Sequence, residues 1–151
     1  MDDIIWSIKS YNDLNTKELY EILKIRQEVF IVEQTCYYLD ADGFDDQAIH
    51  IFAHQDGVIL AYCRIFEPGI KYKESSVGRV LTNPKYRNLK LGKTLMKIAL
   101  SSIQNHFLSN SVRISAQDYL LKFYTDLGFI ATSKKYLEDE IPHTEMYYES
   151  H

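Results

Sequence analysis

An apolar strand that runs into a basic turn and then into a long helix is the feature that most constrains the fold of this chain. Residues Ser76–Leu81 are predicted to form a strand, and Pro84 prevents it from continuing as a paired central strand. An amphipathic helix is expected over Leu89–Phe107. The first turn of a helix exposes unpaired N–H groups and a partial positive charge, and Gly92 has no Cβ to keep a ligand at a distance. The segment therefore predicts a site for a phosphate-like anion.

Charge is unevenly distributed along the chain, although the formal total is only −4 at pH 7. The stretch from Ser75 to Gln117 has no Asp or Glu, and its basic residues are Arg79, Lys85, Arg87, Lys90, Lys93, Lys97 and Arg113. Between Gln27 and Cys63 the pattern reverses, with seven acidic residues and no Lys or Arg. One basic block in an acidic protein favours a local polyanionic ligand over a general nucleic-acid surface. The acidic block is consistent with a cationic acceptor, and the alternative is that both blocks are solvated faces.

The remaining elements are predicted from turn signals, capping residues and apolar spacing. Asn15 is a plausible N-cap for a first helix, Asp56-Gly57 is a strong hairpin signal, and Gly128 lies where a left-handed residue would end a helix. The other expected strands and helices are a strand over Ile4–Tyr11, the hairpin strands Ile49–His54 and Val58–Phe66, a strand over Val112–Ala116, a helix over Tyr119–Leu127, and closing strands over Phe129–Tyr136 and His143–Tyr148. The order β-α-β-β-β-α-β-α-β-β indicates an α+β (α/β) protein with a mixed sheet flanked by helices.

Length and composition place the chain among single-domain globular proteins. Its 151 residues suit one domain, spanning residues 1–151. No apolar run approaches the ~20 residues of a membrane span, and the N-terminus begins with acidic residues rather than a basic signal region. Two cysteines, Cys36 and Cys63, give neither a disulfide framework nor a four-ligand metal spacing. We therefore expect a cytoplasmic protein without a membrane segment or a metal.

The basic turn resembles motif A of the GNAT superfamily of N-acetyltransferases. Gly92-Lys93-Thr94 also matches the end of a Walker A motif, but Arg87 stands where that motif requires a glycine. The GNAT pattern Arg/Gln-x-x-Gly-x-Gly/Ala is present with Lys90 at the position of its first glycine. The resemblance implies acetyl-CoA as cosubstrate, with its pyrophosphate and pantetheine held by Val80, Leu81, Arg87, Leu89, Lys90, Leu91, Gly92, Lys93 and Thr94. We expect the Lys90 backbone to serve this role only if its φ is negative.

A second segment resembles motif B of the same superfamily. It contains Phe123-Tyr124-x-x-x-Gly128-Phe129, in which the Tyr commonly faces the sulfur of coenzyme A, with Phe123 beside it. A phenol with a pKa near 10 is protonated at neutral pH and can protonate a departing thiolate, so Tyr124 is the candidate general acid. The alternative is that Tyr124 is simply a core residue at helical spacing.

Nearly the whole chain resembles the ElaA-like branch of the superfamily. The resemblance lies in Ile25-Arg26-Gln27-Glu28-Val29-Phe30-Ile31-Val32-Glu33-Gln34, Asp42-Gly43, His50, Val77-Gly78-Arg79-Val80, Ala116-Gln117 and Ile141-Pro142-His143, and a lysine at the position of Lys90 is usual there. It implies a GNAT fold with a mostly antiparallel sheet of six to seven strands. Glu33 is the first candidate for the general base, with Glu28 and His50 as alternatives. The predicted acceptor contacts are Arg26, Glu28, His50, Arg79 and Gln117.

The sequence thus predicts an acetyl-CoA-dependent N-acetyltransferase that acts on a primary amine. Arg26 and Arg79 either pair with nearby acids or bind a carboxylate of the acceptor. The alternative function is a non-catalytic module that senses coenzyme A or binds nucleic acid, although nucleic acid is not the expected partner. The aromatic residues around Tyr147 and Tyr148 are compatible with a homodimer.

Overall fold

The computed structural model describes residues 3–150, so the two ends of the predicted domain lie outside the described residues. The expected order of strands and helices is confirmed. The seven strands are β1 (Ile5–Ser10), β2 (Ile49–Gln55), β3 (Val58–Phe66), β4 (Ser76–Thr82), β5 (Ser111–Gln117), β6 (Ile130–Glu138) and β7 (Ile141–Glu149). The α-helices are α1 (Thr16–Arg26), α2 (Gly92–Phe107) and α3 (Leu121–Asp126). No helix among residues 3–150 is both long and apolar enough to span a bilayer.

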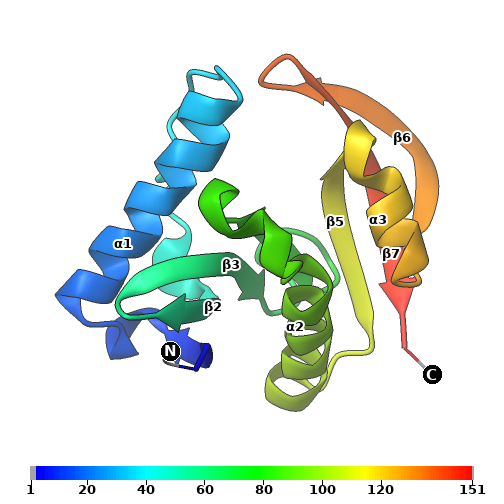
Figure 1. The fold of residues 1–151 in the computed structure, drawn as a ribbon. Helices are drawn as coiled ribbons and strands as arrows, with labels where there is room; N and C mark the ends of the chain where they lie inside the picture. The colour runs from blue at the N-terminus through cyan, green and yellow to red at the C-terminus, as the bar shows by residue number, and fades with distance from the viewer. Residues whose placement is uncertain (1–2, 151) are drawn as a thin grey trace.

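The seven strands form two antiparallel sheets rather than one continuous sheet. Their orders are β1-β2-β3-β4 and β5-β7-β6. A parallel bridge between Ser75 and Val112 joins them, and Arg113 N–H donates to the Ser75 carbonyl at 2.9 Å. Beyond that bridge β4 and β5 do not pair among the described residues, and α2 lies between β3 and β5 in the view of Figure 1. The predicted sheet of six to seven strands is thus present as four strands plus three.

The four-stranded sheet is buried on both faces. One face packs on α1 through a cluster that includes Ile22, Phe52 and Tyr62, and the other packs on α2 through a cluster that includes Leu95 and Ile103. This explains why β3 reads as an almost unbroken apolar run, since a strand covered on both sides has no solvent face to mark.

Local turn chemistry acts as predicted at three places. The Asn15 side chain accepts from Glu18 N–H and Glu18 bonds back to Asn15 N–H, which completes a capping box at α1. Asp56 and Gly57 both have positive φ, as a tight hairpin requires. Gly128 has φ +104° directly after α3, where it ends the helix.

The two predicted helix starts are wrong by several residues. Pro84 and the Asn83 side chain, which accepts from Lys85 N–H, begin a 3₁₀ segment over Pro84–Leu89, and α2 starts only at Gly92. Likewise a 3₁₀ turn over Asp118–Leu120 precedes α3. Both turns hold the chain in a tighter coil just before the helix, so each helix enters from a fixed direction.

Candidate active site

A cavity of about 890 Å³ lies where the two sheets diverge. Its walls come from β4, the first turn of α2, α3, the segment that follows α1, and the hairpin between β6 and β7. The segment after α1 and the hairpin between β6 and β7 lie next to each other, although they are far apart in the sequence (Figure 1). The Cys36 thiol of the first donates to the Asp139 carbonyl of the second at 3.2 Å. The predicted site residues that line the cavity are Glu33, Arg79, Val80, Leu81, Arg87, Lys90, Gly92, Gln117, Phe123 and Tyr124.

The first turn of α2 is open. The residue before it, Leu91, makes no capping hydrogen bond through its side chain, and the turn contains no acidic residue. The first intrahelical acceptor in use is the Leu91 carbonyl, which bonds Leu95 N–H at 2.9 Å. The amides of residues 91–94 therefore remain available to an anion, as helix geometry predicts.

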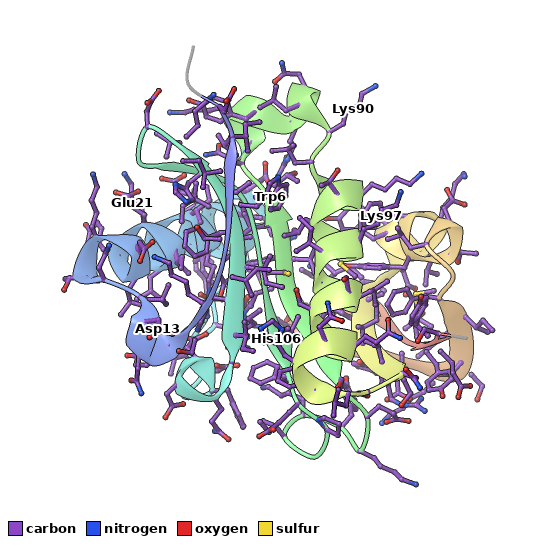
Figure 2. All side chains as sticks on the ribbon, turned by 90° about the horizontal axis from the view of Figure 1, so that it is seen from below. Trp6, Asp13, Glu21, Lys90, Lys97 and His106 are labelled. Atoms are coloured by element: carbon purple, nitrogen blue, oxygen red, sulfur yellow. The ribbon has the colours of Figure 1, made fainter. Side chains whose placement is uncertain are left out.

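Lys90 contradicts the expectation of a negative φ. Its φ is +54° and its ψ is 49°, the left-handed conformation that a glycine at this motif position would adopt most easily. Its N–H donates to the Arg87 carbonyl at 3.1 Å, so this amide is already used inside the turn. The Lys90 side chain extends away from the turn that precedes α2 (Figure 2). Lys90 can therefore offer an anion its ammonium group, whereas the amide contacts fall to the residues after it.

Tyr124 is both a core residue and a cavity residue. Its ring packs edge-on against Phe123 and Phe129, and only 5% of the residue is exposed. Among residues 3–150, the wholly buried side-chain atoms without a hydrogen-bond partner are Arg64 Nε and Ser75 Oγ. The Tyr124 hydroxyl makes no hydrogen bond to another described residue and is not one of these atoms, so it retains access to the cavity that Tyr124 lines. Burial raises its pKa above the ordinary value, which keeps the phenol protonated at neutral pH.

Comparison with known proteins identifies the family of this fold. The acetyltransferase (GNAT) domain model matches residues 15–150. The chain belongs to the GNAT acetyltransferase family. It is 34% identical to Protein ElaA of Escherichia coli over 145 residues, which cover 95% of each protein. A crystal structure of Escherichia coli ElaA superposes with a TM-score of 0.90 over 97% of this chain and all of the other. An acyl-CoA N-acyltransferase structure from Pseudomonas aeruginosa is 40% identical, with a TM-score of 0.89, over 95% of this chain and 99% of that one. A UPF0039 protein of Synechocystis is 37% identical over 145 residues, or 95% and 94% of the two chains. The predicted GNAT fold and ElaA-like branch are confirmed.

Two residues predicted to contact the acceptor have no surface on which to do so. Arg26 is completely buried, and its guanidinium bonds Asp40 at 2.8 Å and Asp45 at 2.7 Å. His50 is also completely buried; Nε2 lies 2.9 Å from the Asp45 carbonyl and Nδ1 lies 2.7 Å from the Tyr62 hydroxyl. A carbonyl can only accept, so Nε2 carries the proton and Nδ1 accepts from Tyr62. Neither Arg26 nor His50 can reach a ligand in this acetyltransferase.

The remaining predicted residues divide between the cavity mouth and the outer surface. Glu28 is exposed and does not line the cavity, and neither do the side chains of Leu89, Leu91, Lys93 and Thr94. Glu33 ends a π-helical segment, Gln27–Glu33, which the 3.6-residue spacing of the sequence did not predict. Both Glu33 oxygens accept from Arg87, at 2.8 and 2.7 Å. Glu33 is therefore engaged in an ion pair with Arg87 at the edge of the cavity.

Gln34 lines the cavity, although it was not among the predicted site residues. The Gln34 and Gln117 amides bond each other in both directions at 3.3 Å, across 83 residues of sequence. The available signal was its position directly after Glu33, within the run that carries the family resemblance. This pair connects the segment after α1 to the end of β5.

The acidic block is neutralised by arginines from other parts of the chain. The expectation that it attracts a cationic acceptor is therefore wrong for most of its centre. Asp40, Asp42 and Asp45 are bonded by arginines from three different elements, namely Arg26, Arg64 and Arg79. The basic block is reduced in the same way, because Arg79, Arg87 and Arg113 are each paired with carboxylates. Lys85, Lys90, Lys93 and Lys97 of the basic block have no ion pair among the described residues.

We expect the free energy of unfolding to fall as the pH drops below about 4, the ordinary Asp value. Burial by itself raises the pKa of Asp42, but hydrogen bonds and charge from Arg64 outweigh it, and the pKa lies well below its usual range. The pKa of Asp45 is lowered similarly, because hydrogen bonds from Arg26 and charge outweigh its burial. The folded carboxylates therefore stay ionised at a pH where the unfolded chain binds protons, so stability is lost as acid protonates them.

Urea unfolding between pH 7 and pH 3 measures this loss. Asp45→Asn removes one of the carboxylates whose pKa is lowered, so the free energy of unfolding should fall less steeply with acid in this variant. Asp126→Asn is the matched control, because Asp126 belongs to an exposed pair with Lys122. A wild-type profile that is level from pH 5 to pH 3 would contradict this account of the network.

Proposed function

We propose that this protein is an acetyl-CoA-dependent N-acetyltransferase that acts on a primary amine, and that it does so in the cytoplasm as a single domain. The observation that carries the proposal is the uncapped first turn of α2 beside the cavity that the Tyr124 hydroxyl reaches. The free amides of this turn suit a diphosphate, and the phenol of Tyr124 suits a departing thiolate. The match to the GNAT domain is the reason to assign both features to one acetyl transfer. A homodimer stays a prediction; Tyr147 lies under Arg113 of its own chain and Tyr148 packs on Phe129.

The amides of Leu91, Gly92, Lys93 and Thr94 would hold the diphosphate of the cosubstrate, with charge from Lys90. Arg87 would join them once it turns from Glu33. Beyond the Ser75–Val112 bridge, β4 forms no hydrogen-bonded pairs with β5 in the described residues. The backbone at Val80 and Leu81 therefore has an unpaired strand edge that faces the cavity. An extended amide chain such as pantetheine can pair with such an edge. Phe123 lines the cavity next to Gly92 and would contact the cosubstrate there.

Acetyl-CoA supplies an activated acetyl group, which forms a bond from its carbonyl carbon to the amine nitrogen as the carbon–sulfur bond breaks. Tyr124 donates its phenolic proton to the sulfur, so that the leaving group departs as a neutral thiol. The amine must lose one proton to attack and another after it is acylated. Glu33 stays the predicted base for this step. Tyr124 recovers its proton from the protons that the amine releases.

Thiol release with acetyl-CoA and a panel of polyamines, amino acids and lysine peptides tests this function directly. Thermal shift with desulfo-CoA and with a short oligonucleotide separates it from a binding module. Binding of desulfo-CoA without thiol release from any amine would favour a sensor of coenzyme A. Stabilisation by the oligonucleotide alone, lost steeply with added salt, would favour a nucleic-acid module.

Gly92→Asp should weaken desulfo-CoA binding by at least about tenfold, because a carboxylate in the first turn of α2 would repel the diphosphate bound there. A Cβ at this position would lie 3.5 Å from the Phe123 ring and 3.8 Å from the Thr82 methyl group, which are ordinary contacts. An acidic residue in the first turn also suits the helix dipole, so the stability of the protein should not fall. Calorimetric titration measures the affinity, and the melting temperature serves as the stability check.

Ser101→Asp is the matched control, because Ser101 is exposed on the same helix beyond its first turn. It should leave the affinity unchanged. If the Gly92 variant binds desulfo-CoA as tightly as the wild type, the diphosphate does not lie against the first turn of α2.

A further inference from the structure

One end of the cavity carries more positive than negative charge. Its ion-pair network connects three carboxylates to four cations, which are Arg26, Arg64, Lys71 and Arg79. The carboxylates are those of Asp40, Asp42 and Asp45. One positive charge in this network of residues 3–150 therefore has no carboxylate of its own. Three of the four cations, Arg64, Lys71 and Arg79, line the cavity.

Two of these cations have unused donors. Arg79 donates from Nε to Asp40 at 2.7 Å and from Nη2 to the Asp40 carbonyl at 3.1 Å. Its Nη1 has no hydrogen-bond partner among the described residues and is not among the wholly buried atoms, so it is accessible from the cavity. Lys71 makes one long bond of 3.4 Å to Asp42, and its side chain is 28% exposed. An ammonium group has three donors, so Lys71 has donors to spare.

The backbone supports the same conclusion at Arg79. Its φ is +51°, a left-handed conformation that is unfavourable for a residue with a Cβ. It lies where the register between β3 and β4 shifts, at Tyr62 and Arg64. Strain of this kind persists where the surrounding structure imposes it, and it concentrates at binding sites. Here it holds a guanidinium group at the cavity wall beside Val80.

The hairpin between β6 and β7 gives the cavity a second electrostatic character. Glu138 and Asp139 line it from that side, and Glu138 is 3.3 Å from His143. A molecule with a carboxylate and an amine would find a partner for each charge in the same cavity. A diamine would leave the positive charge of Arg79 and Lys71 without a partner.

We propose that the acceptor carries a carboxylate, which Arg79 and Lys71 bind, so that the substrate class is an amino acid or a peptide that presents its free carboxyl end. The inference rests on the proposed N-acetyltransferase function and specifies its acceptor. The sequence left open whether Arg26 and Arg79 pair with acids or bind a carboxylate of the acceptor. In this proposal Arg26 pairs only with acids inside the protein, whereas Arg79 binds the acceptor through Nη1.

Matched acceptor pairs test this proposal. Amino acids and dipeptides are each assayed beside their C-terminal amides, which keep the size and the amine but lose the negative charge. The wild type should favour the free acid by about 10- to 100-fold in kcat/KM, mainly through KM, as expected for charged hydrogen bonds. Lys71→Met and Arg79→Gln should each reduce that ratio toward one. Lys73→Met is the control, because Lys73 is exposed and does not line the cavity.

A binding measurement keeps this test separate from the test of catalysis. Protein saturated with desulfo-CoA is titrated with the same acids and amides, and the acid of each pair should bind at least about tenfold more tightly. If no amine supports thiol release but the acids still bind preferentially, the catalytic function fails and the carboxylate site stands. If the wild type uses or binds the amides and simple diamines as well as the acids, the carboxylate site is disproved. A preference that survives both Lys71→Met and Arg79→Gln would place the carboxylate elsewhere.

Discussion

Replacing Tyr124 by Phe should lower kcat by about 10²–10⁴-fold, the usual contribution of a positioned general acid. The ring packs between Phe123 and Phe129, and Phe preserves both contacts, so the core should keep its shape. The hydroxyl makes no hydrogen bond to another described residue, and its removal therefore leaves no buried partner unsatisfied. What is lost is the proton that the departing sulfur would receive. Steady-state thiol release, with the melting temperature as a check, measures the effect.

Binding of desulfo-CoA should be unchanged in this variant, because the residues proposed to hold the diphosphate and pantetheine are all retained. The pH profile provides a second readout. Burial raises the pKa of Tyr124, so the wild type should show no alkaline loss of kcat near pH 10 that is due to this phenol. Turnover equal to that of the wild type would leave Tyr124 as a core residue and remove it from the mechanism.

The local parts of the fold could be predicted because each depends on neighbouring residues. Asn15 and Glu18 form the capping box three residues apart, and Asp56-Gly57 carries its own turn conformation. Gly128 ends α3 by the same kind of rule. Capping and turn preferences act over a few residues, so a single sequence contains the whole signal.

Lys90 marks the limit of that approach. Its left-handed backbone separates the 3₁₀ segment from α2 and moves the start of the predicted helix from Leu89 to Gly92, yet lysine has no preference for this conformation. Nothing near it in the sequence indicates the break except Pro84, six residues earlier. The motif resemblance placed a glycine at this position in the family pattern, and that glycine was the real signal of the conformation.

The charged residues of the site escaped prediction for a different reason. A buried arginine and an exposed one look alike in a sequence, and the partners that decide the matter are distant. Arg79 meets Asp40 across 39 residues, and Arg64 meets Asp42 across 22. The acidic block and the arginines outside it therefore looked like separate surface features. In the folded chain they neutralise one another, apart from the single positive charge at the cavity.

Replacing Arg26 by Met should lower the free energy of unfolding by about 3–5 kcal/mol, the cost of removing one member of a buried ion network. Arg26 is completely buried and bonds Asp40 through Nε and Asp45 through Nη1. Its loss leaves Asp40 with Arg79 and Asp45 with Arg64, each carboxylate short of one donor in a region with little water. Since a domain of this size has a total stability of about 5–15 kcal/mol, the variant should lose a large fraction of that stability. Urea unfolding at pH 7 measures the change.

Lys122→Met provides the surface comparison, because the Lys122–Asp126 pair is exposed on both sides and should cost less than about 1 kcal/mol. Arg26→Lys separates a structural role from contact with the acceptor. It keeps the charge but not the two-pronged geometry, so it should lose stability while KM for the acceptor, measured at a temperature where it is folded, stays unchanged. A rise in KM without loss of stability would contradict the structural role and return Arg26 to the acceptor site. A loss below about 1 kcal/mol in Arg26→Met would mean that the remaining arginines satisfy the three carboxylates on their own, and the surplus positive charge at the cavity would then have to be sought elsewhere.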